Sequence, residues 1–598
     1  MVRKQKLWIT TFEFGPEKLG GLGEVPTNQV KQLQDDVDIT VLMPAHGLIH
    51  GATAKKVQTR SIGYDLDFTQ RFKGMVDDPK NNILDGYPDE APVKIIPYVL
   101  NLPGTRARVI AFSGEDGLTR KILDDPVIYS MTCLKCKIAV FSRALREFVD
   151  HEAALDNVPD CMHVHDYHAV PGILGSRQVL LNRGLDAATI FTVHLLTGPK
   201  VTMDYLACCG VSDATIPFTI KGARVDSRVS DLVQLAKNRL EFIAAYMADV
   251  VTSVSKTYLI ENVIPNCGAD LLDGKTDFIH NGCDWNFDEI SKSVQEASRS
   301  ELTTFLGKKI DKQASRADLR RFLTTWKLGH LPPSEPAIDD PELLKVVKKF
   351  DGVDPYIENS KVKNFPADAK LCLITGRASK QKGIEIVFDA IPSILKEYPT
   401  INFLFSCLPT QGEKALIADY CQRATNDVIK NHVRFIWGKA DSIFRMAHLV
   451  ADIYLAPSRW EPFGIMVLES NAVGLPVIGA GVGGIKETIV DVASNPEEGT
   501  GMVIEKESPS ALATAVLDMV HAIDASEAKD RARLAAIAAS IKGERFRNAV
   551  IKNPGIYEAM RVNARKRVEQ SFRWKIVAKK ELELMSRANR QRELREGR

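Results

Sequence analysis

The length, composition and charge of the chain exclude several classes of protein. Its 598 residues are enough for two domains, and 45% hydrophobic with 26% charged residues is typical of a globular protein. The net charge of +2 provides no general attraction to nucleic acid or to an anionic membrane. The first apolar run is short and is interrupted by Glu13, which predicts a strand instead of a signal peptide, and no stretch is apolar enough to span a bilayer. We therefore expect a cytoplasmic protein with neither nucleic-acid nor membrane partners.

The ten cysteines are scattered along the chain. Cys133 and Cys136 form a CxxC pair, but they lie in a segment that we predict to be helical and buried. No second CxxC completes the ligand set of a zinc site. We interpret the cysteines as small buried hydrophobic residues and expect no metal site.

A glycine-rich loop follows the first predicted strand, residues 7–12. Gly20 and Gly21 allow the backbone to approach a ligand closely, and Pro26 suits the first turn of a helix whose free amides would face the loop. Lys18 lies just before the glycines and could supply a point charge to a phosphate. The alternative interpretation is a glycine turn with a solvated lysine.

Polar, titratable side chains follow two further predicted strands. Residues 161–164 form a predicted strand that leads to Asp166, Tyr167 and His168, and the next strand ends at His194. Ligands of open parallel sheets bind at the carboxyl ends of the strands. We therefore consider His168 and His194 as candidate site residues, although a single histidine is more often structural.

The second half of the chain begins with a polar, helical segment, residues 286–369, in which no chemistry is recognisable. A strand at 371–375 then leads into a basic loop and a helix. Arg377 and Lys382 lie five residues apart on this loop, where a guanidinium and an ammonium could converge on one diphosphate. The alternative is an ordinary solvated loop.

Two carboxylates flank the beginning of a later helix, residues 465–472. Glu461 lies in the preceding loop, which is rich in residues that a core would not select, and Glu469 lies in the helix itself. Carboxylates accept hydrogen bonds from hydroxyl groups, and the amides at a helix N-terminus bind anionic or hydroxyl oxygens. The arrangement suits a polyol ligand, whereas two surface glutamates are the simpler alternative.

Taken together, these patterns resemble the glycogen and starch synthase family, of archaeal or bacterial type, whose members are retaining glycosyltransferases. The Lys-x-Gly-Gly-Leu loop at Lys18 is similar to the family's nucleotide-diphosphate loop, with Glu24 where an aspartate is common and Glu13 at the position of the preceding glutamate. Asp166-Tyr167-His168 resembles the family's Asp-Trp-His.

The resemblance continues in the second half of the chain. Arg377 and Lys382 match the family's Gly-Arg and Gln-Lys-Gly motifs, and Glu461 opens a Glu-Pro-Phe-Gly loop like that of the family. The sequence departs from the family at two further positions. Leu195 replaces an asparagine of the family beside His194, and the Tyr-x-Asp-Asn run expected near Tyr129, which contributes to the acceptor side in the family, has no aspartate.

The resemblance implies an α/β fold of two facing Rossmann-like domains, the glycosyltransferase-B fold, with a deep interdomain cleft. We expect an N-terminal, acceptor-side domain over residues 1–285 and a helical linker or insertion over 286–369. A nucleotide-sugar domain is expected over 370–570. Residues 571–598 are predicted to form a C-terminal helix that crosses back to the first domain.

The implied reaction is transfer of glucose from ADP- or UDP-glucose to the non-reducing end of an α-1,4-glucan. The nucleotide-sugar would be a substrate, so we expect no cofactor, and the acceptor glucan would be the second partner; a homo-oligomer is compatible with the sequence. The predicted catalytic residues are Glu461, His168, Arg377 and Lys382. The predicted substrate-binding residues are Lys18, Gly20, Gly21, Glu13, His194, Phe463, Gly464 and Glu469.

Other functions remain open on the sequence alone. Glu469 also fits a related transferase with a small acceptor, such as a trehalose- or sucrose-type synthase. The missing aspartate near Tyr129 fits a non-catalytic glucan-binding protein, and an epimerase acting on a nucleotide-sugar would use the same fold. The nucleotide base, the acceptor length, the oligomeric state and the role of residues 286–369 are not determined by the sequence.

Overall fold

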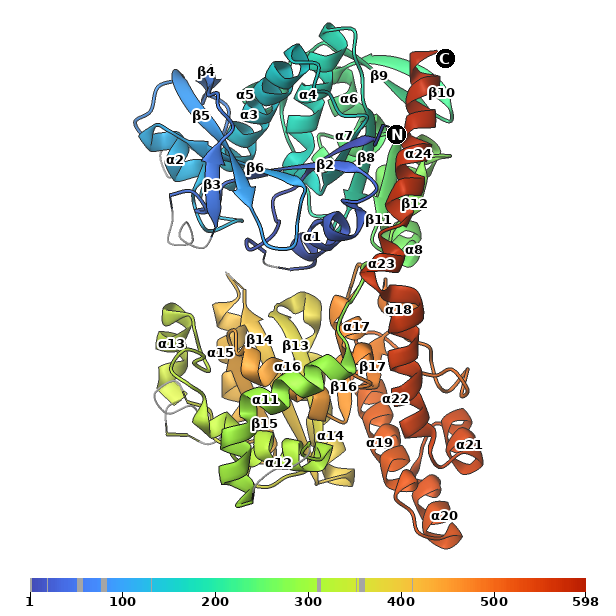
Figure 1. Cartoon of the computed structure of the whole chain (residues 1–598). Helices are drawn as coiled ribbons and strands as arrows, with labels where there is room; N and C mark the ends of the chain where they lie inside the picture. The colour runs from blue at the N-terminus through green and yellow to red at the C-terminus, as the bar shows by residue number, and fades with distance from the viewer. Residues whose placement is uncertain are drawn as a thin grey trace. The chain divides into compact units, whose positions relative to one another are not determined.

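The chain folds into two compact α/β units. The computed structural model describes residues 3–18, 20–50, 57–76, 83–130, 132–308, 313–350, 352–353, 361–410 and 412–597. The first unit combines Met1–Asn281 with Trp574–Arg598, and the second comprises Gly282–Arg573 (Figure 1). Within the described ranges, no helix combines the length and apolarity needed to cross a bilayer.

The first unit is built on one large sheet. Its strand order is β12-β11-β8-β7-β1-β2-β6-β5-β3, and β4 also pairs with β5. The strands from β12 to β6 run parallel, and β5 is antiparallel to β6, β3 and β4. The bounds are β1 Lys6–Thr10, β2 Asp38–Pro44, β3 Gln58–Ser61, β4 Leu66–Arg71, β5 Glu90–Asn101, β6 Arg108–Gly114, β7 Cys161–His165, β8 Ala188–Val193, β11 Val250–Ser253 and β12 Thr276–Phe278.

Both faces of this sheet are covered, which is why its central strands are almost entirely apolar. Side chains alternate between the two faces of a strand. On β1, Trp8 therefore packs in the core shared with α3 (Leu134–Ala154), while Leu7 and Ile9 pack in the core shared with α1 (Gly21–Leu33) and α24 (Lys580–Glu596).

The C-terminal helix α24 packs against β7, β8 and β11 of the first unit, beside which Figure 1 draws it in red. It is held there by buried ionic groups. Arg595 is fully buried, donates to Asp186 Oδ2 at 2.8 Å and pairs with Asp249. Because these charges are removed from water, their mutual pairing is needed to keep the helix in place.

The second unit contains a parallel sheet of strand order β15-β14-β13-β16-β17-β18. On β13, Cys372 and Ile374 pack toward α14 and α19, while Leu371 and Leu373 pack toward α12 and α16. The strands are β13 Lys370–Ala378, β14 Ile401–Pro409, β15 Val433–Trp437, β16 Ile453–Ala456, β17 Val477–Ala480 and β18 Gly501–Ile504. The helices are α12 Arg316–Thr325, α14 Ile384–Glu397, α16 Asp441–Val450, α17 Ile465–Ala472 and α19 Pro509–Ser526.

Residues 286–369, for which we expected a linker or an insertion, belong to the second unit. Helices α11 (Phe287–Leu306) and α12 pack on α16, and α13 (Pro341–Val347) packs on α15 (Lys414–Ala424). The segment therefore contributes helices to the second unit's core and is not a separate connecting element.

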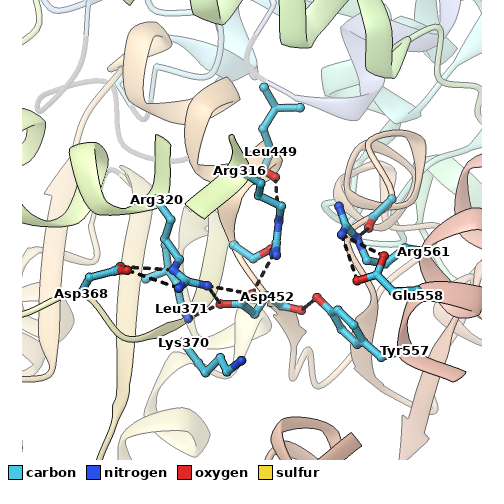
Figure 2. Close-up of polar contacts among 12 residues, drawn as sticks. Arg316, Arg320, Asp368, Lys370, Leu371, Leu449, Asp452, Tyr557, Glu558 and Arg561 are labelled. Atoms are coloured by element: carbon cyan, nitrogen blue, oxygen red, sulfur yellow. Dashed lines mark hydrogen bonds and ion pairs between the residues drawn. The ribbon is translucent and has the colours of Figure 1, made fainter. Parts of the chain in front are cut away.

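An ionic cluster around the buried Asp452 attaches α12 to the sheet (Figure 2). Asp452, which immediately precedes β16, accepts hydrogen bonds from Arg316 at 2.9 Å and Arg320 at 3.1 Å. Its Oδ2 also accepts from the amide of Leu371 at 2.8 Å, and the hydroxyl of Tyr557 donates to its carbonyl at 2.8 Å. Burial alone would raise the pKa of Asp452, but the two guanidinium groups more than offset this and hold it below its usual value.

Candidate active site

In the second unit, the structure brings together two residues predicted from separate motifs. Lys382 follows β13 in a short 3-10 turn, and Glu461 lies in the loop after β16. The ammonium of Lys382 forms an ion pair with the carboxylate of Glu461, and the two side chains are 12% and 9% exposed. Ser458 Oγ donates to the same carboxylate at 3.4 Å. A cation and a carboxylate thus meet at the carboxyl edge of the sheet, where ligands of such folds bind.

Gln381, which we did not predict as a site residue, connects the two loops that carry this ion pair. Its side-chain oxygen accepts from Arg377 Nη2 at 3.4 Å, and its amide nitrogen donates to the carbonyl of Trp460 at 3.1 Å. Its backbone carbonyl also accepts from the amide of Arg459 at 2.9 Å. The neutral amide of Gln381 therefore fixes the distance between the basic loop and the loop that carries Glu461.

The approach of these two loops requires a glycine. Gly383 has a φ of +63°, and a Cβ at this position would lie 2.4 Å from the carbonyl oxygen of Pro457. A side chain would push the basic loop away from the end of β16. This close contact explains the glycine in the Gln-Lys-Gly motif.

The remaining predicted residues of the second unit differ in exposure. Phe463 is only 1% exposed, and its ring lies 6.1 Å from that of Phe572, so its side chain is part of the core and only its backbone can contact a substrate. Gly464 is the N-cap of α17, with a φ of +91°. Glu469 lies within α17 and is half-buried.

In the first unit, the buried side chain of Glu13 supports the glycine loop. Glu13, predicted to bind substrate, is 2% exposed; its carboxylate accepts from the hydroxyl of Tyr129 at 2.5 Å and from the amide of Gly20 at 3.2 Å. These contacts assign it a supporting position beneath the loop. Lys18 Nζ lies 2.7 Å from Glu24 Oε1, and both side chains remain partly exposed.

Gly20 and Gly21 form the beginning of α1. Gly20 is the N-cap and has no side chain with which to cap the helix, and its own amide donates to Glu13. The first amides of a helix have no partner within the helix and attract anions. The helix therefore begins directly after the glycine loop, and the contact of its first amides with a phosphate stays a prediction.

His168 is packed among aromatic rings. The ring centroids of Phe12, Tyr129 and Tyr167 lie 5.0, 4.9 and 3.8 Å from that of His168. Burial lowers the pKa of His168 to about 3, and its Nδ1 is buried without a hydrogen-bond partner in the described part of the chain. The ring is therefore neutral near pH 7, and Tyr129 connects it to Glu13 and the glycine loop.

His194 lies beside a second buried histidine. Its Nε2 is 2.9 Å from Nδ1 of His165, and burial lowers the pKa of His194 to about 3. The two rings therefore form a neutral pair in which one nitrogen donates and the other accepts. The pair places His194 at the same sheet edge as His168.

Asp166, which precedes His168 by two residues, has an unusual backbone. Its φ of +58° lies in the left-handed region, which a residue with a Cβ rarely adopts. Its Oδ1 accepts from the amides of His194 at 2.7 Å and Leu195 at 3.4 Å. Burial raises the pKa of Asp166 to about 8, although these two amides act in the opposite direction.

The part of the chain that the structure describes contains no group of three or more His, Cys, Asp or Glu side chains that could hold a metal ion. All ten cysteines lie in this part, and all are free and buried. Cys133 and Cys136 thus pack as the sequence interpretation expects.

Comparison with known proteins gives matches over most of the chain. A family model described as "Starch synthase catalytic domain" matches residues 6–275, and one described as "Glycosyl transferases group 1" matches residues 356–538. Glycogen synthase 2 of Geobacter metallireducens is 25% identical over 388 residues, covering 64% of this chain and 67% of its own. The glycogen synthase of Burkholderia thailandensis is 25% identical over 454 residues, covering 71% and 73%.

Among solved structures, the catalytic domain of starch synthase IV from Arabidopsis thaliana, bound to ADP and acarbose, is similar with a TM-score of 0.64. The match covers 98% of this chain and 99% of that chain, at 17% sequence identity. At this identity the likeness establishes a shared fold.

Proposed function

Because the chain belongs to the glycogen and starch synthase family of glycosyltransferases, we propose that it transfers glucose from a nucleotide-glucose donor to the non-reducing end of an α-1,4-glucan. The anomeric configuration would be retained. The family predicted from the sequence is confirmed by the family models, and the predicted glycosyltransferase-B fold by the likeness to starch synthase IV.

The observation that carries the proposal is the ion pair of Lys382 with Glu461 beside Arg377. The reaction must stabilise a departing nucleoside diphosphate and an oxocarbenium-like sugar. Lys382 and Arg377 supply positive charge for the diphosphate, and Glu461 supplies a carboxylate for the sugar. Without a bound donor, the ion pair neutralises the charges of Lys382 and Glu461. A bound donor would replace the ion pair, with its diphosphate contacting Lys382 and its sugar contacting Glu461.

The first unit would supply further contacts to the donor. Lys18 and the amides that begin α1 at Gly21, directly after Gly20, suit the diphosphate, because they combine a point charge with the positive end of a helix. The neutral rings of His168 and His194 suit sugar hydroxyl groups, to which an imidazole can donate or accept a hydrogen bond.

The second unit completes the set of proposed contacts. Glu469 would accept a hydrogen bond from the ribose, and Phe463 and Gly464 would contribute backbone groups. In this proposal the nucleotide-sugar is a substrate and no cofactor takes part, since cationic side chains neutralise the diphosphate. We assign the protein to the cytoplasm, with which ten free cysteines agree.

The test is release of nucleoside diphosphate from ADP-glucose and from UDP-glucose, each incubated with glycogen, with free glucose and without acceptor. We expect release with glycogen from one of the two donors, which also identifies the base. Release with free glucose instead would establish a small-acceptor synthase. No release in any mixture, despite binding of glycogen, would establish a non-catalytic glucan-binding protein.

A further inference from the structure

Every backbone amide of residues 194–198, the loop that follows β8, is bound by a buried side chain. Asp166 accepts from the first two amides, those of His194 and Leu195. The hydroxyl of Tyr258 accepts from the third, that of residue 196, at 3.1 Å. Glu241 Oε1 accepts from the fourth, at 2.8 Å, and from the fifth. Five successive amides thus depend on three side chains from three separate elements.

Glu241 is the central support of this loop. It lies on α7 (Leu240–Met247) and is 1% exposed. The loop fits it so closely that a Cβ at Gly198 would lie 1.8 Å from Glu241 Oε2. Only glycine can occupy position 198 while the carboxylate remains in place.

The direction of these hydrogen bonds determines what the loop offers to a ligand. Its amides donate hydrogen bonds to buried side chains of the protein. In the described ranges no protein group donates to a carbonyl of residues 194–198. The loop therefore presents hydrogen-bond acceptors. A diphosphate only accepts hydrogen bonds and would face both these carbonyls and two buried carboxyl groups, whereas the hydroxyl groups of a neutral sugar can donate.

The loop also lies at the edge of the sheet that carries the candidate site. His194 is its first residue, and it is 2.9 Å from His165 at the end of β7. Asp166 joins the ends of β7 and β8, two residues before His168. The unbound carbonyls therefore begin next to the histidines proposed to contact sugar hydroxyls.

We propose that residues 194–198 bind hexose hydroxyl groups through their backbone carbonyls, and that Glu241 is the positioning residue that holds the loop in its binding shape. The inference rests on the proposed function and extends it to sugar recognition. The hexose belongs either to the glucan acceptor or to the glucose of the donor, and the two sources give different kinetic results.

The decisive comparison is Glu241→Leu against Glu241→Gln. Leucine leaves two buried amides without an acceptor, whereas glutamine retains the oxygen to which both amides donate. We expect Glu241→Leu to raise a sugar KM by about tenfold or more, with kcat changed less, and Glu241→Gln to remain within about threefold of the unmodified chain. A rise confined to glycogen identifies the acceptor, and a rise confined to the nucleotide-sugar identifies the donor glucose.

Glu152→Leu is the matched control for general destabilisation. Glu152 is 3% exposed and pairs with Arg108 at the start of β6, at the amino end of the parallel strands. Its replacement should lower the thermal midpoint without changing either KM. If Glu241→Leu does not fold, Gly198→Ala displaces the same loop and replaces it in the comparison.

Titration of the chain with maltoheptaose separates this inference from the proposed function. The chain could release no nucleoside diphosphate and still bind maltoheptaose, with binding abolished by Glu241→Leu and preserved by Glu241→Gln. In that case the proposed function is wrong and the inference stands. A folded Glu241→Leu or Gly198→Ala variant with unchanged KM for both substrates and unchanged maltoheptaose binding would overturn the inference.

Discussion

Nδ1 of His163 lies 2.8 Å from Oε1 of Glu581, a residue 418 positions later in the chain. Both side chains are almost completely buried, and Nε2 of the same imidazole lies 2.7 Å from Thr192 Oγ1. A residue of β7 thus depends on a residue of the C-terminal helix. The C-terminal helix thus packs against the strands that lead to His168 and His194.

We predict that Glu581→Ala lowers the free energy of unfolding by about 3 kcal/mol, because it leaves a buried imidazole without its partner. Equilibrium urea unfolding followed by circular dichroism measures this change. Glu583→Ala is the control on the same helix, since its 70% exposed side chain forms a surface ion pair with Lys580, and it should change stability by less than about 0.5 kcal/mol. Equal effects of the two substitutions would contradict a special role of the buried pair.

Substitution of the Lys382–Glu461 pair should abolish most of the activity. We expect Lys382→Ala and Glu461→Ala each to reduce kcat by about a hundredfold or more, because each removes a charge proposed to stabilise the transition state. Release of nucleoside diphosphate with glycogen measures the rate, and circular dichroism verifies the fold. Lys380→Ala, an exposed position in the same basic turn, should retain nearly full activity. Near-normal rates in either test variant would remove our assignment of the site.

The carboxyl group of Asp166 should make stability depend on pH. Its pKa is about 8 in the folded chain and near the ordinary value of 3.8 in the unfolded chain, so the folded state binds the proton more tightly. This contribution is fully present below about pH 4 and is lost as the pH rises toward about 8. Asp166→Asn cannot titrate and should lack the contribution.

The measurement is the difference in unfolding free energy between Asp166→Asn and the unmodified chain at pH 5, 6, 7 and 8. We expect this difference to shift steadily in favour of the asparagine variant as the pH rises. A difference that is independent of pH over this range would show that Asp166 does not titrate there.

The cluster around Asp452 should be essential to the second unit (Figure 2). Asp452→Ala leaves the guanidinium groups of Arg316 and Arg320 without their shared carboxylate, which we expect to lower stability by about 3–5 kcal/mol. Thermal unfolding measures the loss. Asp427→Ala is the control, because Asp427 is 91% exposed in its ion pair with Lys430 and should contribute little. A loss no larger than that of the control would show that α12 is held mainly by apolar packing.

Much of the candidate site was predictable because it depends on local patterns. The loop at Lys18, the strand end before His168, the basic turn at Lys382 and the loop at Glu461 each lie between a strand and a helix, as their spacing predicts. Such transitions are visible in a few consecutive residues, because glycine, proline and apolar periodicity act over short distances.

Burial was harder to predict, since it depends on which distant segments pack together. Glu13 and Glu461 have the same side chain, but the carboxylate of Glu13 is buried beneath the glycine loop and supports it. Phe463 belongs to a loop typical of the site, yet its ring packs in the core. The membership of residues 286–369 in the second unit likewise depends on Arg316 and Arg320 meeting Asp452.

The sequence by itself therefore determined the family, the α/β class and the positions of the loops that carry the candidate residues, because these follow from local patterns and from motifs in a fixed order. The tertiary structure determined which candidate residues contact each other and which residues hold a neighbouring loop in position. Lys382 meets Glu461, and Glu241 holds the amides of the loop after β8, across separations of 79 and 44 residues. Such contacts form only when separate elements pack, and no local pattern contains them.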